Sequence, residues 1–199
     1  FLFFLIGMAF YYGFRLFALT PWYDELYTYY YFISRGPVYA AIHWPLPNNH
    51  VGYSVLSAVL DFSGSSAVGL RGISWLSSLI GLCLLFAISR QWFPKGSVLL
   101  PVFLFASMGI VNQLAVQGRG YALTSCLYLT IIYELLRIVK EHDCRRRNYV
   151  IMGCAFIWAL YTLPSSVYFV LPLCIAGGTW LLLEKRWKAF RKLFIMAVV

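Results

Sequence analysis

The sequence predicts an all-α polytopic membrane protein, with about six to seven transmembrane helices and interfacial helices in the first external loop. Hydrophobic residues make up 61% of the chain and charged residues only 12%, a composition too apolar for a soluble domain. Several apolar segments have about the 20 residues that a helix needs to cross the hydrocarbon core. The net charge of +9 comes from basic residues that gather in short loops, which favours a membrane topology signal over nucleic-acid binding.

Apolar segments predict the spans in chain order. They cover residues 1–19, 70–89, 97–116, 121–139, 149–163 and 165–183, and a further one starts near residue 193. The chain begins without Met inside one apolar run and ends inside another, so we expect the N-terminal part of a longer protein, truncated at both ends. Short connections and the lack of a sequence repeat predict a single transmembrane domain over residues 1–199.

The basic residues predict the orientation of these spans. They fall in three loops: Arg90 and Lys95; Arg137, Lys140, Arg145, Arg146 and Arg147; and Lys185, Arg186, Lys188, Arg191 and Lys192. Two spans separate each loop from the next, so all three lie on one side, which the positive-inside rule identifies as the cytoplasm. One span separates the first basic loop from residues 20–69. We therefore expect residues 20–69 to form a long external loop.

Two features of this loop indicate contact with the membrane surface. The apolar segment Val51–Phe62 is too short to cross and has Asp61 near its end, which favours an interfacial helix. Aromatic residues, which concentrate at the headgroup level of membranes, are frequent: Trp22, Tyr23, Tyr27, Tyr29, Tyr30, Tyr31, Tyr39 and Trp44. The loop therefore lies along the outer interface.

The acidic pair Asp24-Glu25 directly follows the first span. Carboxylates at a bilayer surface are costly to desolvate and are commonly placed there for a partner or for chemistry. An alternative interpretation is that both are first-turn acids of an interfacial helix opened by Thr20 and Pro21, where the helix dipole favours them. Both interpretations stay open from the pair alone.

Four short elements in a fixed order carry a family resemblance. They are Asp24-Glu25, Asn48-Asn49-His50-Val51-Gly52-Tyr53, Arg71-Gly72-Ile73-Ser74 and Gln117-Gly118-Arg119-Gly120-Tyr121-Ala122-Leu123. In this order the chain resembles the GT-C glycosyltransferases, and among them the protein O-mannosyltransferases and aminoarabinose transferases, which use polyprenyl-phosphate sugars. Two positions depart from the family pattern: His50 is followed by Val-Gly-Tyr where relatives often have Pro-Pro-Leu, and Gly118 stands where many have an acid.

Sugar transfer from a lipid phosphate explains these residue types. A carboxylate that accepts the proton of the nucleophile contributes about 10²- to 10⁴-fold in rate, and we assign this catalytic role to Asp24. Glu25 points about 100° away on a helix, so we expect it to orient a neighbour or the acceptor. Arginine binds phosphate oxygens two at a time, which suits Arg71 and Arg119 at the outer ends of their spans. Alternatively, both arginines reach to the outer headgroups as simple anchors.

The resemblance also implies a substrate-binding role for Asn49, His50 and Tyr121. His50 is expected to cap the short helix or to contact donor or acceptor. Residues His43 and His50 are separated by prolines and have no helical ligand spacing, so they do not predict a metal site.

No cofactor is expected. Some GT-C relatives hold a divalent metal with two acids that are separated by one residue, D-x-D. Here the pattern is Asp24-Glu25-Leu26, with no acid two residues after Asp24. A hard cation usually takes more oxygen ligands than one adjacent pair offers. We expect metal-independent transfer, with a divalent metal as the alternative.

The predicted function is therefore a membrane glycosyltransferase with its active site outside, most simply in a bacterial inner membrane. The expected partners are a polyprenyl-phosphate-linked sugar, a lipid, glycan or protein acceptor, and membrane lipids, with no nucleic acid. The main alternative is a transporter or flippase of lipid-linked sugars, although such proteins carry ionisable groups or broken helices near the bilayer midplane. A structural membrane subunit would leave the grouping of Asp24, Arg71 and Arg119 unexplained.

Overall fold

The computed structural model describes residues 1–43 and 49–198, and every regular element in this part of the chain is a helix. The chain divides into two compact units, Phe1–Cys126 and Leu127–Val199. Trp44 and Asn48, which belong to elements predicted above, lie outside the described residues. A single transmembrane domain over residues 1–199 depends on how the two units are arranged together, and it stays a prediction.

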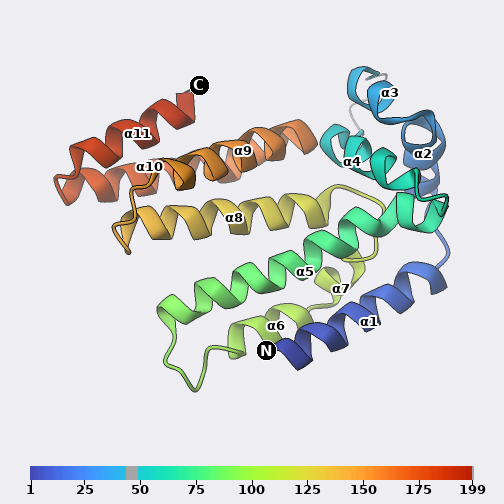
Figure 1. The fold of residues 1–199 in the computed structure, drawn as a ribbon, viewed down its shortest axis with the longest axis horizontal. Helices are drawn as coiled ribbons and strands as arrows, with labels where there is room; N and C mark the ends of the chain where they lie inside the picture. Colours follow the sequence, from blue (N-terminus) through green and yellow to red (C-terminus); the bar gives the residue numbers. More distant parts are fainter. Residues whose placement is uncertain (44–48, 199) are drawn as a thin grey trace. The chain divides into compact units, whose positions relative to one another are not determined.

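The first unit is built on two long helices that lie side by side, α1 (Leu2–Ala18) and α5 (Ser66–Trp92) (Figure 1). Tyr12 of α1 and Leu82 of α5 are completely or almost completely buried between them. In the same core, Trp75 donates its indole N–H to the carbonyl of Ala9 at 3.1 Å. This cross-helix bond fixes the register of α5 on α1, because a Trp N–H buried among apolar groups needs an acceptor.

The described residues between α1 and α5 form short helices, as predicted for this part of the chain. They are α2 (Tyr23–Tyr31), the 3₁₀ turn η1 (Ile33–Arg35), α3 (Pro37–Ile42) and α4 (Val51–Asp61). The helix axis bends by 82° between α1 and the segment Tyr23–Arg35. The predicted helix over Val51–Phe62 is confirmed as α4, which packs on α5. Their interfacial position stays a prediction.

The predicted span over residues 97–116 is broken into two short helices, α6 (Leu100–Ser107) and α7 (Gly109–Leu114). Met108 between them has extended backbone angles, which ends the helix. The side-chain amide of Asn112 donates to the carbonyls of Ala106 and Met108 at 2.8 and 3.0 Å. A side chain that satisfies carbonyls freed at a break stabilises the break, and apolarity alone does not reveal it.

The second unit begins within α8 (Tyr121–Val139) and continues through α9 (Arg146–Thr162), the 3₁₀ turn η2 (Pro164–Ser166), α10 (Val167–Leu183) and α11 (Trp187–Val198). Its core contains Ile131, Met152 and Leu181, each with no exposed surface.

Basic residues of this unit also make structural contacts. Arg186 donates to the carbonyls of Ile138 and Val139 at the end of α8, at 2.7 and 2.8 Å, and so caps that helix end. The carboxylate of Asp143 binds both Arg137 and Arg145. The hydrogen bond from Arg145 holds the pKa of Asp143 well below its usual range.

The chain is an all-helical membrane protein. Three described helical segments are long and apolar enough to cross a membrane, Ser66–Trp92, Tyr121–Val139 and Pro164–Leu183, and a fourth is counted if the bent pair around Pro21 is one span. Helices α1 and α9 have 17 residues each, just under a full crossing. The described residues therefore contain three to four candidate membrane spans. The larger count of six to seven stays a prediction.

The predicted orientation is tested by thiol labelling of intact cells with a membrane-impermeant maleimide. Ser63 lies in the exposed turn between α4 and α5, so Ser63→Cys changes one atom and adds a reporter on the side that the positive-inside rule makes external. We expect Ser63→Cys to be labelled and the partly exposed native Cys144 to react only after permeabilisation. The parent protein, with its five native cysteines, is the control. Labelling of Cys144 in intact cells would reverse the topology.

Candidate active site

A buried ion pair joins the start of α2 to α5. The carboxylate of Glu25 accepts from Arg71 through both oxygens, from Nε at 2.8 Å and from Nη2 at 3.0 Å. Glu25 is 1% exposed and Arg71 is 3% exposed. Two parallel N–H···O bonds of this kind fix orientation as well as distance. The pair therefore sets how α2 sits on α5.

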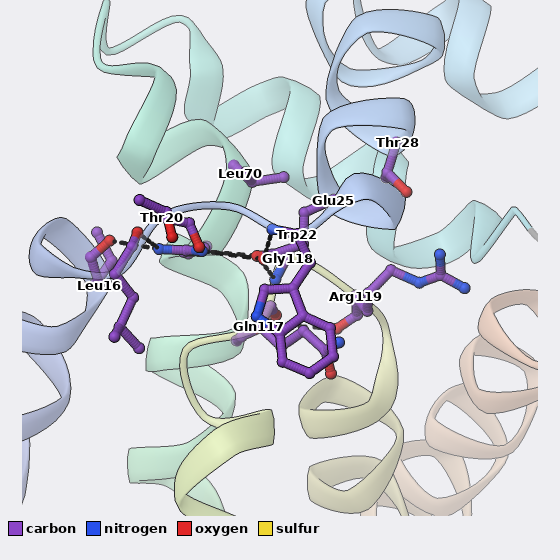
Figure 2. A network of polar contacts seen from close by, with 12 residues as sticks. Leu16, Thr20, Trp22, Glu25, Thr28, Leu70, Gln117, Gly118 and Arg119 are labelled. Carbon is purple, nitrogen blue, oxygen red and sulfur yellow. Dashed lines mark hydrogen bonds and ion pairs between the residues drawn. The ribbon is translucent and has the colours of Figure 1, made fainter.

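Arg71 also closes the end of α1. Its two Nη atoms donate to the carbonyls of Leu16, Leu19 and Thr20 at 3.0, 2.7 and 3.3 Å. With the two bonds to Glu25, these contacts engage the five N–H groups of the guanidinium. Figure 2 shows the carbonyl groups around Leu16 and Thr20 on one side of this network and Glu25 on the other. All donors of Arg71 thus serve the protein itself.

The loop before α8 is fastened to the same carboxylate (Figure 2). The backbone N–H of Gly118 donates to Glu25 Oε1 at 2.5 Å, and the N–H of Trp22 donates to Oε2 at 2.9 Å. A Cβ at position 118 would lie 2.5 Å from Leu70 Cδ1 and 3.0 Å from Glu25 Oε1, so a larger residue there would displace Leu70 and crowd the carboxylate. The glycine at this position thus allows the loop to lie close to Glu25.

Ser74 binds the loop and Tyr53 binds α5, roles that the sequence analysis did not assign to them. Ser74 Oγ donates to the carbonyl of Gln117 at 2.6 Å, and the phenol of Tyr53 donates to the carbonyl of Leu70 at 2.5 Å. Both side chains are completely buried. Both residues lie within the sequence elements that carry the family resemblance, and this was the signal that could have identified them. A buried hydroxyl is favourable where it donates to a backbone carbonyl.

Asp24 and Arg119 form a second, looser ion pair. Asp24 Oδ2 lies 3.5 Å from Arg119 Nη1. The Asp24 side chain is 57% exposed, whereas that of Arg119 is 4% exposed. In Figure 2 the side chain of Arg119 extends away from the carboxylate of Glu25. In such an arrangement the accessible carboxylate can accept a proton, and the buried guanidinium beside it can bind an anion.

His50 completes this cluster. It occupies the N-cap position of α4, but its side chain does not cap that helix. Instead, Nδ1 accepts the backbone N–H of Gly120 at 2.8 Å, and Nε2 lies 3.5 Å from Arg119 Nη2. Burial, and then the charge of Arg119, lower the pKa of His50 to about 3. The imidazole is therefore neutral at physiological pH.

The two remaining predicted residues lie beside His50. The ring of Tyr121 meets the imidazole edge to face, with centroids 4.8 Å apart at 87°, and so supports its orientation. Asn49 Oδ1 accepts from Ser54 Oγ at 2.8 Å, while its buried Nδ2 has no hydrogen-bond partner in the described part of the chain. Substrate binding by Tyr121 and Asn49 stays a prediction.

The structure thus brings the predicted site residues together in two linked groups. Glu25 and Arg71 form a buried group, and Asp24, Arg119 and His50 form a more accessible one. The divergence of Asp24 and Glu25 follows from their adjacent places on α2. Their roles in catalysis and binding stay predictions.

Two small cavities flank the buried group. One, of about 180 Å³, is lined by α1, α2 and α5, and the other, of about 100 Å³, lies between Thr20, Trp22, Gln113 and Gln117. Within residues 1–43 and 49–198, no cluster of three or more His, Cys, Asp or Glu side chains is close enough to hold a metal ion. Metal-independent transfer itself stays a prediction.

Comparison with known proteins adds one finding. Residues 50–199 match a family model described as dolichyl-phosphate-mannose-protein mannosyltransferase. The matched range includes His50, Arg71 and Arg119, whereas Asp24 and Glu25 precede it. No curated protein and no solved structure matches the chain.

The contrast between the two acids predicts different effects on stability. Glu25→Gln leaves the Arg71 charge buried without its partner, and breaking such a pair costs about 3 to 5 kcal/mol. Asp24→Asn removes a half-exposed pair worth under about 1 kcal/mol. Denaturant titration of the purified protein in detergent measures both changes in the free energy of unfolding. Equal, small losses in the two variants would refute the structural role of Glu25.

Proposed function

Because the chain belongs to the dolichyl-phosphate-mannose-protein mannosyltransferase family, we propose that it transfers a hexosyl or pentosyl group from a polyprenyl-phosphate donor to an acceptor at the external membrane face. It is an integral-membrane glycosyltransferase that uses a lipid-linked sugar. The observation that carries the proposal is the position of Arg119, 3.5 Å from both the Asp24 carboxylate and the His50 imidazole. This grouping combines a base with a binding site for an anion.

The reaction exchanges one bond at the anomeric carbon for another. The acceptor hydroxyl forms a bond to that carbon while the bond to the phosphate oxygen breaks, and the electron pair leaves with the polyprenyl phosphate. Asp24 takes the proton of the acceptor, because its side chain is the exposed carboxylate of the site. A protein or glycan acceptor fits the family, and the choice between them follows from surfaces outside this site.

Arg119 stabilises the leaving phosphate in this scheme. The phosphate of the donor carries about one negative charge and gains about one more as the glycosidic bond breaks. A buried guanidinium placed where charge develops lowers the barrier more than an exposed cation would. The ion pair between Arg119 and Asp24 is long and half exposed, so a phosphate replaces this one contact at little cost.

Arg71 has a different part in the proposal. The sequence suggested that it binds phosphate together with Arg119, but its N–H groups are engaged with Glu25 and three carbonyls of the α1 end. A phosphate would have to replace these buried bonds, each of which is worth about 1.5 to 3 kcal/mol when a charged group is involved. We therefore assign Arg71 and Glu25 to positioning of the site.

The membrane arrangement completes the proposal. We propose six to seven spans, in which α1, α9, the broken pair α6–α7 and α11 cross or enter the bilayer besides the three long segments. The exposed aromatic residues Trp22, Tyr23, Tyr30 and Tyr31 of the first loop lie at the outer headgroups. A bacterial inner membrane provides the polyprenyl phosphates that this reaction needs.

Asp24→Asn tests the base. We expect turnover to fall by about 10²- to 10⁴-fold, while donor binding stays within a few-fold, because the amide keeps the shape but cannot accept the proton. Transfer from a radiolabelled polyprenyl-phosphate sugar and equilibrium binding of the same donor measure the two effects in the full-length protein. Turnover within a few-fold of the parent would exclude Asp24 as the base. Donor binding by the parent without any transfer would favour a flippase.

Arg119→Lys tests the phosphate ligand. Lysine keeps the charge but loses the fork that binds two oxygens, so donor affinity should fall by about 10- to 150-fold. Arg35→Lys is the matched control, because Arg35 is exposed in the same loop region and its guanidinium contacts the side chains of Tyr31 and Tyr39. It should bind the donor as the parent does. Donor affinity like that of the parent in both variants would show that Arg119 is a simple membrane anchor.

A further inference from the structure

Helices α9 and α11 of the second unit pack on each other (Figure 1). Lys192 of α11 lies over the ring of Tyr149 of α9, with Nζ 5.6 Å from the ring centroid. One turn further along both helices, a Cβ at Gly153 would lie 3.1 Å from Met196 Cγ. The two contacts follow in the same order on each helix, so α9 and α11 run in the same direction.

An apolar groove of about 630 Å³ lies between these two helices. Its large apolar side chains are open to the surroundings, since Val150, Ile157 and Ile195 are each more than half exposed. The volume is within the range of ligand-binding sites. Exposed apolar walls of this extent favour an apolar occupant.

The charged side chains of the groove gather at one end. Arg146 is the first residue of α9 and lies one turn before Tyr149, on which Lys192 packs. Residues three apart on a helix are neighbours on its surface, so cations from both helices meet at this end. The described residues that line the groove include no acidic side chain. The groove therefore suits an occupant with an apolar chain and an anionic head.

Both cations have hydrogen-bond donors available for such a head. Lys192 donates to the carbonyl of Cys144 at 3.3 Å, which leaves two of its three N–H groups. The guanidinium of Arg146 makes no hydrogen bond or ion pair within residues 1–43 and 49–198. A phosphate at this end of the groove thus displaces no protein contact of Arg146.

The length of the groove matches the depth of one membrane leaflet. From Arg146 to Ile157 the helix rises about 17 Å, at about 1.5 Å per residue. Half of the hydrocarbon core is about 15 Å. An acyl chain whose headgroup lies at Arg146 therefore ends near the bilayer midplane, at the level of Ile157.

We propose that the groove between α9 and α11 binds one anionic phospholipid, with its phosphate against Arg146 and Lys192 and an acyl chain along the apolar walls. The bound lipid joins α11 to α9, because each helix supplies one cation. The proposal is independent of the sugar-transfer reaction, since it uses none of the residues of the candidate active site. In the competing interpretation, both cations only reach to the headgroup layer and no lipid is bound in the groove.

Lipid titration of the purified full-length protein in detergent, followed by native mass spectrometry, tests the charged end. The probes are phosphatidylglycerol and phosphatidylcholine with identical acyl chains. We expect phosphatidylglycerol to bind roughly 30-fold more tightly, because two cations contribute to its attraction. In the double variant Arg146→Gln/Lys192→Gln, the two affinities should differ by less than about threefold.

Arg147→Gln is the matched control. It removes the same charge at the next residue, which is not among the residues that line the groove. We expect this variant to keep the preference of the parent for phosphatidylglycerol. A loss as large as that in Arg146→Gln would show diffuse attraction to a basic surface and would overturn the proposal. Equal affinities of the parent for the two lipids would overturn it as well.

Two native cysteines locate the lipid without any substitution. Cys154 is exposed and lines the groove, whereas Cys83 is exposed on α5. We expect saturating phosphatidylglycerol to slow alkylation of Cys154 by N-ethylmaleimide and to leave Cys83 unchanged, as read by mass spectrometry of the peptides. Equal protection of both cysteines, or none, would refute binding in the groove. A Cys154 that is unreactive before lipid is added would show that another segment of the protein covers the groove, which also refutes it.

Discussion

The site depends on the buried ion pair between Glu25 and Arg71. One carboxylate receives two bonds from Arg71, one from Gly118 and one from Trp22. Through Arg71 it is also joined to the carbonyls that end α1. Three segments that are far apart in sequence, residues 16–25, Arg71 and Gly118, meet at this one group, so its loss would release all of them together.

The reactive residues are placed as chain neighbours of this pinned pair. Asp24 precedes Glu25, and Arg119 follows Gly118. Because adjacent residues on a helix or in a tight loop point in different directions, pinning one member turns the next toward the accessible side. Asp24 and Arg119 thereby come within 3.5 Å of each other. The precision of the site comes from the buried group behind it.

The sequence predicted the helical class, the short helices of the first loop and the residues that meet at the site. Those features follow from composition, segment length and the order of short elements. It did not predict the break at Met108, because the amide of Asn112 replaces lost helix bonds through contacts that periodicity does not show. It separated Asp24 from Glu25 but gave Arg71 and Arg119 the same role, since the partners of a buried guanidinium depend on packing between distant segments.

Magnitudes explain why the two ion pairs are not interchangeable. Breaking the buried pair costs about 3 to 5 kcal/mol, which one phosphate bond of about 1.5 to 3 kcal/mol does not offset, and a phosphate on Arg71 would also displace its bonds to the carbonyls at the end of α1. A half-exposed pair is worth under about 1 kcal/mol, so the same phosphate bonds more than offset its loss. In the proposed reaction, Arg119 is therefore the guanidinium that binds the phosphate, and Asp24 is the carboxylate that receives the acceptor proton. Glu25 and Arg71 keep a positioning role in this proposal, because a phosphate would have to replace the five buried bonds of Arg71.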